Sequence, residues 1–538
     1  MMRPRTLTFL VVALGTAGVL LSGGAPAVGQ NPRPGGVLTV AQREETPQGF
    51  AIHESSTIST TWPAMPCFSN LVLFHPLKQQ ESVDTVVGEL AEKWSWQDNY
   101  RNLVFFLRKN VKWHDGQPFT SKDVKFTFDM LREAPDAAGK LRINPRKDWY
   151  ANVHSIEAPD PYTVIFHLKR PQPSLLLMLA SGYTPVYAAH VPPAQYRTAC
   201  VGTGPYKLKE WRKGEFIEYV KNPDYFVKDR PLLDGIRYII IKERGTRVAA
   251  LHAGQVQVAF PGDTSKTTAE QLKKAVPQLV VTRAAENVNE NVIMNTKKPP
   301  FDNLKARLAV AHGIDRRALN QAVHQGGGAV GVSIPSRPWG VWGVLDKDMA
   351  AMPGYGKAAD EKAKARKLMA ELGYGPDKPV KVEIVTRAIA IYVDMASFII
   401  NELKQIGIEA SLKQIETAQW HAMATRGEYQ LGANLTGIGI DDPDANYYEN
   451  FACNSPRNYT FYCNEALAAL FDKQSAEIDA KKRLALVWEI QKKLEDEATR
   501  PTLTWRVDNF SHWPQVKGLI PHNNFYNYGR MQEVWLDK

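Results

Sequence analysis

The sequence predicts an α/β protein built from two lobes. Segments in which apolar and polar residues alternate, as they do in strands, recur between segments whose apolar residues follow helical spacing. About 510 residues remain after a leader-like N-terminal segment, which is too many for one core of ordinary size and indicates two or three domains. Neither a fixed-period repeat nor a low-complexity tract interrupts the pattern.

Residues 1–29 are typical of a secretory signal peptide, because two early arginines precede an apolar run and then a stretch of small residues. The run, residues 7–21, is shorter than the roughly 20 residues of a membrane-spanning helix. We expect cleavage near Ala27 to Gly29, with an uncleaved membrane anchor as the alternative. No cysteine precedes Cys67. We therefore expect a chain that is free in the periplasm and is not a lipoprotein.

Composition limits the function classes. The formal charge is +10 and the hydrophobic content is 44%, which is ordinary for a globular protein. No block of five or six like charges occurs, so nucleic-acid binding is not supported. After the leader, the longest apolar run is residues 175–180, which is a core segment by its length.

The first half of the chain is predicted to alternate between strands and helices. Residues 202–226 begin with two glycines and a proline and continue as a hairpin whose tip is Lys213-Gly214. Thr120 and Ser121 are candidate N-caps of a helix. The other predicted segments are a strand at 35–42, a helical or mixed apolar turn at 68–77, strand-turn-helix at 103–133, strand-helix at 161–180 and strand-helix-strand at 231–260.

Helices are predicted to be more frequent after residue 300. Apolar residues at helical spacing predict helices over 304–323, 360–374, 392–412 and 481–498. Strands are predicted between them, over 380–387 and 429–439.

The four cysteines favour disulfides over metal binding. Cys453 and Cys463 enclose nine residues with turn-forming Asn, Ser and Pro, a length that a disulfide closes easily, so we expect this pair to be bonded. For Cys67 and Cys200 the sequence leaves pairing open. Close CxxC spacing with nearby histidines is missing, so no metal site is predicted.

No arrangement of residues predicts catalysis. His114 and Asp115 lie in a turn, without the G-x-S-x-G or H-E-x-x-H pattern of a hydrolase. Asp441, Asp442 and Asp444 lack the frame of an EF-hand calcium loop. We therefore predict no enzyme activity, no cofactor and no metal. Aromatic residues near turns, such as Trp62 and Trp339, are candidates for the wall of a pocket between lobes.

Three long segments, in this order, resemble one family. They are LAEKWSWQDNYRNLVFFLRKNVKWHDGQPFTSKDVKFTFDML, GTGPYKLKEWRKGEFIEYVKNPDYF and VIMNTKKPPFDNLKARLAVAHGIDRRAL. They resemble the bacterial extracellular solute-binding proteins of family 5, the dipeptide, oligopeptide and nickel-binding group that serves ABC importers. The resemblance covers essentially the whole mature chain.

The resemblance implies a two-lobed periplasmic binding protein, type II and cluster C-like, with an inserted domain and a hinge between the lobes. It implies a monomer that captures a peptide or small molecule by hinge closure and delivers it to permease subunits in the inner membrane. The implied domains are a discontinuous first domain (30–62, 199–290 and 508–538), an inserted second domain (63–198) and a third domain that forms the second lobe (291–507).

The resemblance also nominates the ligand site. In the family's peptide binders, a loop before an acidic-proline pair bonds to the peptide backbone, and an aspartate three residues before the acidic residue binds the α-amine. Asp442-Pro443 aligns that pair, so the aspartate position is Gly439, and Asp441 or Asp442 is a candidate substitute. The other implied contacts are Leu435 and Gly437 for backbone pairing, Ser55, Ser56, Thr57 and Ile58 from the other lobe, and Arg337 and Trp339 as further candidates.

The missing aspartate leaves the ligand open. The alternatives within the receptor role are an opine-like compound, a sugar conjugate or an aromatic acid. A secreted hydrolase and a periplasmic chaperone are alternatives from other classes.

Overall fold

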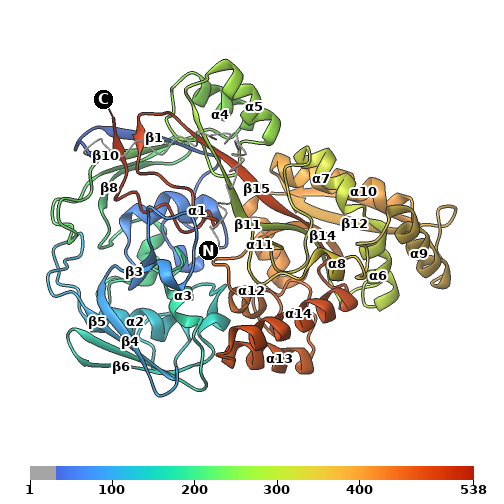
Figure 1. Ribbon diagram of the computed structural model, residues 1–538, viewed down its shortest axis with the longest axis horizontal. Helices are drawn as coiled ribbons and strands as arrows, with labels where there is room; N and C mark the ends of the chain where they lie inside the picture. The colour runs from blue at the N-terminus through green and yellow to red at the C-terminus, as the bar shows by residue number, and fades with distance from the viewer. Residues whose placement is uncertain (1–31, 338, 538) are drawn as a thin grey trace, which may run out of the picture.

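The computed structural model describes residues 32–337 and 339–537, which form two α/β lobes (Figure 1). The predicted signal peptide, residues 1–29, lies outside the described residues. The first lobe consists of the elements between residues 37 and 275 together with the C-terminal segment 513–537. The second lobe consists of the elements between residues 304 and 497. Two long strands, β11 (Val280–Met294) and β15 (Thr502–His512), run between them.

The first lobe contains two four-stranded sheets. One has the strand order β1-β10-β9-β8, in which β1 is parallel to β10 and the other pairs are antiparallel. The other is antiparallel, with the order β4-β5-β7-β6. The strands are β1 (Val37–Gln42), β4 (Ala91–Gln97), β5 (Asn102–Leu107), β6 (Val153–Asp160), β7 (Thr163–Leu168), β8 (Tyr206–Arg212), β9 (Phe216–Lys221) and β10 (Gly235–Ile240), with short pairs β2 (Val72–Phe74) and β3 (Val86–Gly88), and β16 (Val516–Lys517) and β17 (Trp535–Leu536).

Five helices complete the first lobe: α1 (Ile58–Ala64), α2 (Ser121–Leu131), α3 (Leu175–Leu179), α4 (Arg244–His252) and α5 (Lys266–Ala275). Thr120 is the N-cap of α2, as the sequence predicts. In return, the Asp123 carboxylate accepts a hydrogen bond from the Thr120 amide. The hairpin predicted within 202–226 is formed by β8 and β9, with Gly214 at a φ of 77° at its tip.

The second lobe is a five-stranded sheet with helices around it. The strand order is β13-β12-β14-β11-β15, and β12 is parallel to both β13 and β14. Met395, Ile399 and Leu403 form a stripe on α10 that is fully buried, and each such side chain contributes about 1.5–3 kcal/mol on burial. The elements are β12 (Val380–Arg387), β13 (Ile408–Ile415), β14 (Leu431–Gly437), α6 (Leu304–Gly313), α7 (Arg316–His324), α8 (Asp346–Met349), α9 (Ala358–Glu371), α10 (Ala390–Lys404), α11 (Thr417–Arg426), α12 (Pro443–Asn450), α13 (Glu465–Ala476) and α14 (Ala480–Glu497).

The two long strands join the lobes through an antiparallel ladder that is interrupted by a register shift between Ala285 and Asn289 and by another between Glu290 and Asn291. β11 and β15 are antiparallel from Val280 opposite His512 to Asn291 opposite Thr502. At their first-lobe end, Val258 bridges both Val40 of β1 and His512 of β15. The strands therefore cross the middle of the molecule, between the two lobes (Figure 1).

Four predicted elements differ from the structure. Residues 68–77 contain strand β2 and not a helical turn. The helix predicted over 304–323 is divided in two, because Asp315 caps the N-terminus of α7. The helix predicted over 392–412 ends at Lys404, where Gly407 has a φ of 87° and lets β13 begin and pair with β12. The strand predicted at the end of 231–260 is reduced to isolated bridges at Val258.

Both cysteine pairs are bonded. The predicted Cys453–Cys463 disulfide is confirmed, and Cys67 is bonded to Cys200 as well. Gly202 lies so close to Cys67 that a Cβ on it would be 1.8 Å from the Cys67 carbonyl oxygen. Gly202 and Gly204 therefore allow this close packing beside the disulfide, whereas Gly214 forms the hairpin tip.

Candidate ligand-binding site

The candidate site, which we call the inner cavity, lies between the two lobes. The space within it, counted together with open solvent, is about 470 Å³, and it adjoins a larger groove of about 1640 Å³ with which it shares Arg43 and Arg506. The first lobe and the two long strands contribute Arg43, Ser56, Thr57, Ile58, Pro261, Glu286, Val288, Arg506, Phe525 and Tyr526. The second lobe contributes Arg387, Tyr392, His421, Asn434, Leu435 and Gly437.

The predicted segment Ser55–Ile58 forms one wall. Ser56, Thr57 and Ile58 line the cavity. Thr57 is the N-cap of α1, and its hydroxyl accepts the Ser59 amide at 3.3 Å. Ser55 lies behind this wall, where its carbonyl accepts a hydrogen bond from Arg146 at 2.5 Å. The cap and this bond together fix the wall's position.

The end of β14 forms the opposite wall. Within the described chain, β12 pairs with β14 only at Leu431 and Gly432, so the edge of β14 that faces away from β11 has no strand partner beyond that point. Leu435 and Gly437 lie on this stretch and line the cavity. Gly437 also admits Tyr526, because a Cβ there would be 2.0 Å from the tyrosine oxygen. A free strand edge is the geometry that accepts an extended ligand backbone.

Gly439 lies outside the cavity lining and is covered. Its carbonyl accepts hydrogen bonds from Ser181 and Asn527, both at 3.1 Å. A Cβ on Gly439 would be 2.6 Å from the Trp149 ring, and that ring is held by a 3.0 Å bond from its nitrogen to the Ala445 carbonyl. The space into which an acidic side chain would extend is therefore filled by an indole.

The two aspartates after Gly439 also lie outside the lining. Asp442 caps α12, and its two carboxylate oxygens accept hydrogen bonds from Arg483 at 2.7 and 2.8 Å, so it is not free to turn toward a ligand. Burial and the neighbouring Asp442 carboxylate raise the pKa of Asp441 to about 7.

The predicted tryptophans and Arg337 do not line the cavity. Trp62 is fully buried and packs edge-to-face against Phe510 and Tyr528. Trp339 is half-buried beside Arg283, and Arg337 is exposed. The fold therefore gives Trp62 a core position, because the helix that carries it is buried on all sides.

Sequence patterns do not identify the charged residues in and beside the cavity. Glu44 is central: its carboxylate accepts hydrogen bonds from Ser59 at 2.5 Å, from Thr417 at 2.9 Å and from Arg387 at 3.1 Å. Because Thr417 and Arg387 belong to the second lobe, Glu44 joins the two lobes. Burial opposes the charge of Glu44, but Arg387 and the other partners outweigh it and lower the pKa.

One signal could have found Arg387. It is the last residue of β12, a strand with parallel neighbours, and open α/β sheets bind ligands outside the carboxyl ends of such strands. Its neighbour His421 is uncharged, because burial lowers its pKa well below the usual range and two arginines add to the effect.

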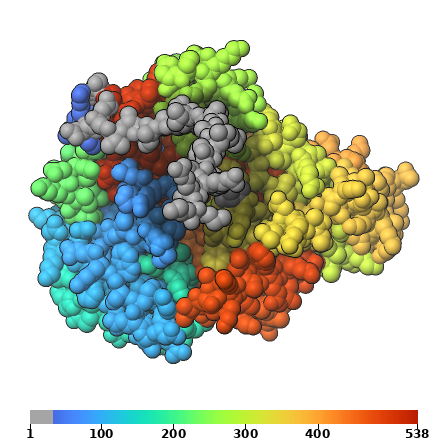
Figure 2. Space-filling model, in the orientation of Figure 1, coloured from blue at the N-terminus to red at the C-terminus, as the bar shows by residue number. Residues whose placement is uncertain are grey.

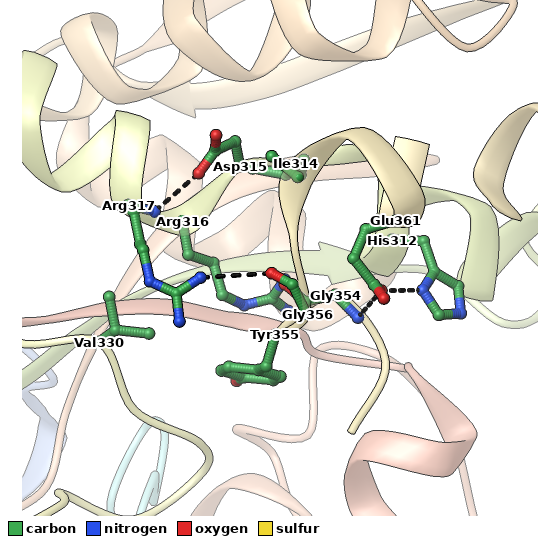
Figure 3. A pocket seen from close by; sticks show the side chains of 11 residues that line it. His312, Ile314, Asp315, Arg316, Arg317, Val330, Gly354, Tyr355, Gly356 and Glu361 are labelled. Atoms are coloured by element: carbon green, nitrogen blue, oxygen red, sulfur yellow. Dashed lines mark hydrogen bonds and ion pairs between the residues drawn. The ribbon is translucent and has the colours of Figure 1, made fainter. Parts of the chain in front are cut away.

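A second, smaller hollow lies within the second lobe (Figure 3). Its polar side chains are bonded to one another and to the local backbone: His312 to Glu361, and Arg317 to the Gly356 carbonyl at 3.2 Å. A movement of one lobe against the other would not open or close it. The inner cavity is therefore the better candidate for a ligand.

The described residues form neither a membrane-spanning helix nor a cluster of metal-binding side chains. In 32–337 and 339–537, no helix is both long and apolar enough to cross a membrane. The same residues contain no group of three or more His, Cys, Asp or Glu side chains that could hold a metal ion.

The family follows from a comparison of the sequence with protein-family models. Residues 85–458, more than half of the chain, match the model of bacterial extracellular solute-binding proteins, family 5, Middle. The chain belongs to this family. The resemblance inferred from the three motifs is confirmed.

Curated family 5 relatives span nearly the same length. A probable di/tripeptide-binding protein 5 of Pseudomonas aeruginosa is 26% identical over 507 residues, which cover 88% of this chain and 91% of the relative. The dipeptide-binding protein of Escherichia coli is 26% identical over 492 residues, which cover 85% of this chain and 86% of the relative.

Solved structures confirm the two-lobed fold of family 5 for this chain. The periplasmic binding protein DppA from Helicobacter pylori, in complex with the peptide STSA, has a TM-score of 0.82 at 25% identity and covers 94% of this chain and 99% of its own. AgaA from A. tumefaciens R10, in complex with agropinic acid, has a TM-score of 0.79 at 23% identity and covers 94% of this chain and 99% of its own.

Proposed function

We propose that the protein is the periplasmic solute-binding component of an ABC importer and that it captures a peptide or peptide-like solute between its lobes. The observation that carries the proposal is the free edge of β14 at Leu435–Gly437, which faces the Ser56–Ile58 wall across the inner cavity. Family membership and the peptide-binding relatives support the same role. The role requires binding and release at a membrane permease and no chemical step, so we propose that the protein is not an enzyme.

We propose that closure of the lobes follows the domain boundaries expected from the family. In this scheme 30–62, 199–290 and 508–538 form one domain, 63–198 is inserted in it, and 291–507 forms the second lobe. The Cys67–Cys200 disulfide ties the two ends of the inserted segment together, and β11 and β15 pass between the lobes at the expected boundaries. The leader 1–29 is proposed to direct export and to be removed.

The lobes meet in the structure through several hydrogen bonds besides those of Glu44. Asp444 of α12 accepts from Ser174 at 2.5 Å, and Asp472 of α13 is bonded to Arg170. The space-filling view shows the C-terminal helices against the first lobe along one face (Figure 2). Contacts of this kind stabilise the closed form, which a ligand between the lobes would favour further.

Matched peptides test the proposed function. We expect calorimetry to detect binding of short peptides such as Ala-Ala-Ala, and small-angle scattering to detect closure. A depsipeptide with the same side chains, in which an ester replaces one of the two amides, should bind about threefold to tenfold more weakly, since a hydrogen bond contributes roughly 0.5–1.5 kcal/mol. Equal affinities would contradict backbone pairing at β14.

A non-peptide ligand is the second candidate within the same receptor role. The observation that favours it is Trp149, which fills the space beside Gly439 where family peptide binders place an amine-binding aspartate. Native mass spectrometry of gently purified protein distinguishes the two, because a co-purified solute would be identified by its mass.

A further inference from the structure

The charges that line the inner cavity do not balance. Three guanidinium groups line it, those of Arg43, Arg387 and Arg506, and the only carboxylate among the lining residues is that of Glu286. Glu44, which lies beside the cavity and lines the outer groove, adds one more negative charge. Behind the lining, Glu290 and Asp508 also act on Arg506, and Asp263 acts on Arg43. The question is therefore which guanidinium group lacks hydrogen-bond acceptors of its own, because a charge that is removed from water without a partner is costly.

Two of the three arginines have partners. Arg387 donates to Tyr392 at 2.7 Å, to Thr417 at 2.7 Å and to Glu44 at 3.1 Å. Arg506 lies 3.1 Å from the Glu286 carboxylate and donates to the Gly262 carbonyl at 3.0 Å. These two groups are held by the protein itself.

Arg43 is the exception. Its Nε donates to the Ser59 hydroxyl at 3.1 Å and lies 3.4 Å from the Glu44 oxygen that Arg387 also contacts. In the described part of the chain, its two terminal nitrogens have no hydrogen-bond acceptor. The side chain is 13% exposed, and that exposed part faces the space where the cavity meets the groove, since Arg43 lines both. The two terminal nitrogens of Arg43 are therefore hydrogen-bond donors without an acceptor among the described residues, at the boundary between the cavity and the groove.

The environment of Arg43 favours an anion over any other partner. Burial lowers the pKa of Arg43; the Glu44 carboxylate partly offsets this effect, and the positive charge of Arg387 adds to it, so an incoming negative group would further stabilise the charged guanidinium. The guanidinium lies over the Phe260 ring, at 5.0 Å from its centroid, which fixes the plane of the fork. A planar guanidinium with two free donors matches a carboxylate or another oxyanion with two acceptor oxygens.

We propose that the cavity selects an acidic solute and that the terminal nitrogens of Arg43 bind its carboxylate or other oxyanion. Glu44 is the positioning residue: its carboxylate accepts hydrogen bonds from Arg387 and Thr417 and lies 3.4 Å from the Arg43 Nε, so the terminal nitrogens of Arg43 are left without an acceptor among the described residues. Outside the cavity lining, the indole of Trp149 fills the space beside Gly439, so that position offers no carboxylate that would favour a cationic group. This inference rests on the proposed function of solute capture and specifies the ligand class.

Three blocked dipeptides of nearly equal size separate charge from shape. They are N-acetyl-Ala-Ala, which carries one carboxylate, N-acetyl-Ala-Ala-amide, which is neutral, and Ala-Ala-amide, which carries one amine. Calorimetry on the full exported chain should show that the acid binds at least tenfold more tightly than the neutral probe. Succinate and inorganic phosphate, each titrated separately, distinguish a carboxylate site from a general oxyanion site.

Variants at Arg43 locate the effect. Arg43→Gln should remove the preference for the acid over the neutral probe, whereas Arg43→Lys should retain part of the preference because it keeps the charge. Arg212→Gln is the matched control: it removes one positive charge from the exposed hairpin and should change nothing. Circular dichroism confirms that each variant is folded.

The outcomes separate this inference from the proposed function. Equal binding of acid and neutral probe by the unmodified protein would overturn the inference while leaving solute capture intact. So would a preference that survives in Arg43→Gln, or a co-purified solute without an acidic group. If no probe binds and no solute co-purifies, the proposed function fails together with the inference. If Arg43→Gln does not fold, Arg43→Lys and the comparison of the three probes still decide.

Discussion

Two buried groups of arginine and carboxylate side chains are arranged differently in this protein: one lies within a single lobe, and the other spans both lobes. Inside the second lobe, Asp442 at the start of α12 is bonded through both oxygens to Arg483 of α14. Between the lobes, Glu44 shares its carboxylate among Ser59, Thr417 and Arg387, while Arg43 beside it keeps two donors free. One group is complete within a single lobe, and the other is complete only when the lobes are closed.

The difference indicates which charges serve stability and which serve binding. A bidentate pair within one lobe persists whether the cleft is open or closed, so it holds α12 and α14 together at all times. When the lobes separate, the two partners of a pair that spans the cleft move apart and form hydrogen bonds with water instead. The free energy that such a pair contributes therefore depends on the distance between the lobes. The following predictions test this distinction, from the largest expected effect to the smallest.

Breaking the pair within the lobe should have the largest effect. Asp442→Ala removes the bidentate partner of the buried Arg483 and leaves it with Asp444 at 3.5 Å and Gln474 at 3.1 Å, so the free energy of unfolding should fall by up to about 3–5 kcal/mol. Urea denaturation measures it. Asp441→Ala is the neighbouring control and should cost much less, because Asp441 forms no ion pair with the described residues. Equal losses in the two variants would contradict a special role for the Asp442–Arg483 pair.

Removing the disulfide next to α12 should destabilise the second lobe without changing ligand preference. Cys453→Ser with Cys463→Ser opens a short loop, which lowers the free energy of unfolding by roughly 2–3 kcal/mol in the chain-entropy model. The preference for the acidic probe should be unchanged, because Arg43 lies in the other lobe. Peptide mapping without reduction should recover the linked pair from the unmodified protein.

A side chain at Gly439 should disturb the contact between the lobes. Gly439→Ala places a methyl group against the Trp149 ring, and overpacking of this kind costs about 1–3 kcal/mol. Because Trp149 belongs to the first lobe and Gly439 to the second, we expect small-angle scattering to show a shift toward the open form. Trp149→Phe in the same background should restore closure, and failure of this rescue would contradict the steric explanation.

The free energy of unfolding should depend on pH through the titration of Asp441. Its pKa is about 7 in the folded protein and about 3.8 when unfolded, so the folded state favours the neutral form. Its contribution is therefore fully present below about pH 4 and is lost as the pH rises to about 7. Thermal unfolding should show this loss in the unmodified protein, and Asp441→Asn should reduce it. Glu44 has the opposite sign, because its lowered pKa makes its contribution fade as the pH falls.

The smallest effect should be that of a free amine on the ligand. Without an acid at Gly439, we expect Ala-Ala and N-acetyl-Ala-Ala to differ by less than tenfold in affinity, about 1.4 kcal/mol. A larger preference for the free amine in calorimetry would contradict this expectation. If the preference then vanished in Asp441→Asn, that carboxylate would be the substitute amine ligand.

Part of the site could be predicted from the sequence, and part could not. Ser56, Thr57, Ile58, Leu435 and Gly437 were selected through the family resemblance, and the structure brings them together around one cavity. Trp62 was selected because it is a tryptophan near a turn, but burial of a large apolar ring in the core is the stronger tendency. The cavity's arginines were not selected, because an isolated arginine in the sequence does not reveal whether its charge will be paired.

The sequence by itself determined the local elements and the family. The hairpin at 206–221, the strand Val380–Arg387 and the helix Ala480–Glu497 are encoded by periodicity and turn residues that act over a few positions. Only the tertiary structure decided which charged side chains pair with each other and which side chains fill the space between the lobes. Glu44 and Arg387 are 343 positions apart, and Trp149 reaches Gly439 from the other lobe. Pairing and packing depend on distances of a few ångströms, which exist only after the chain has folded.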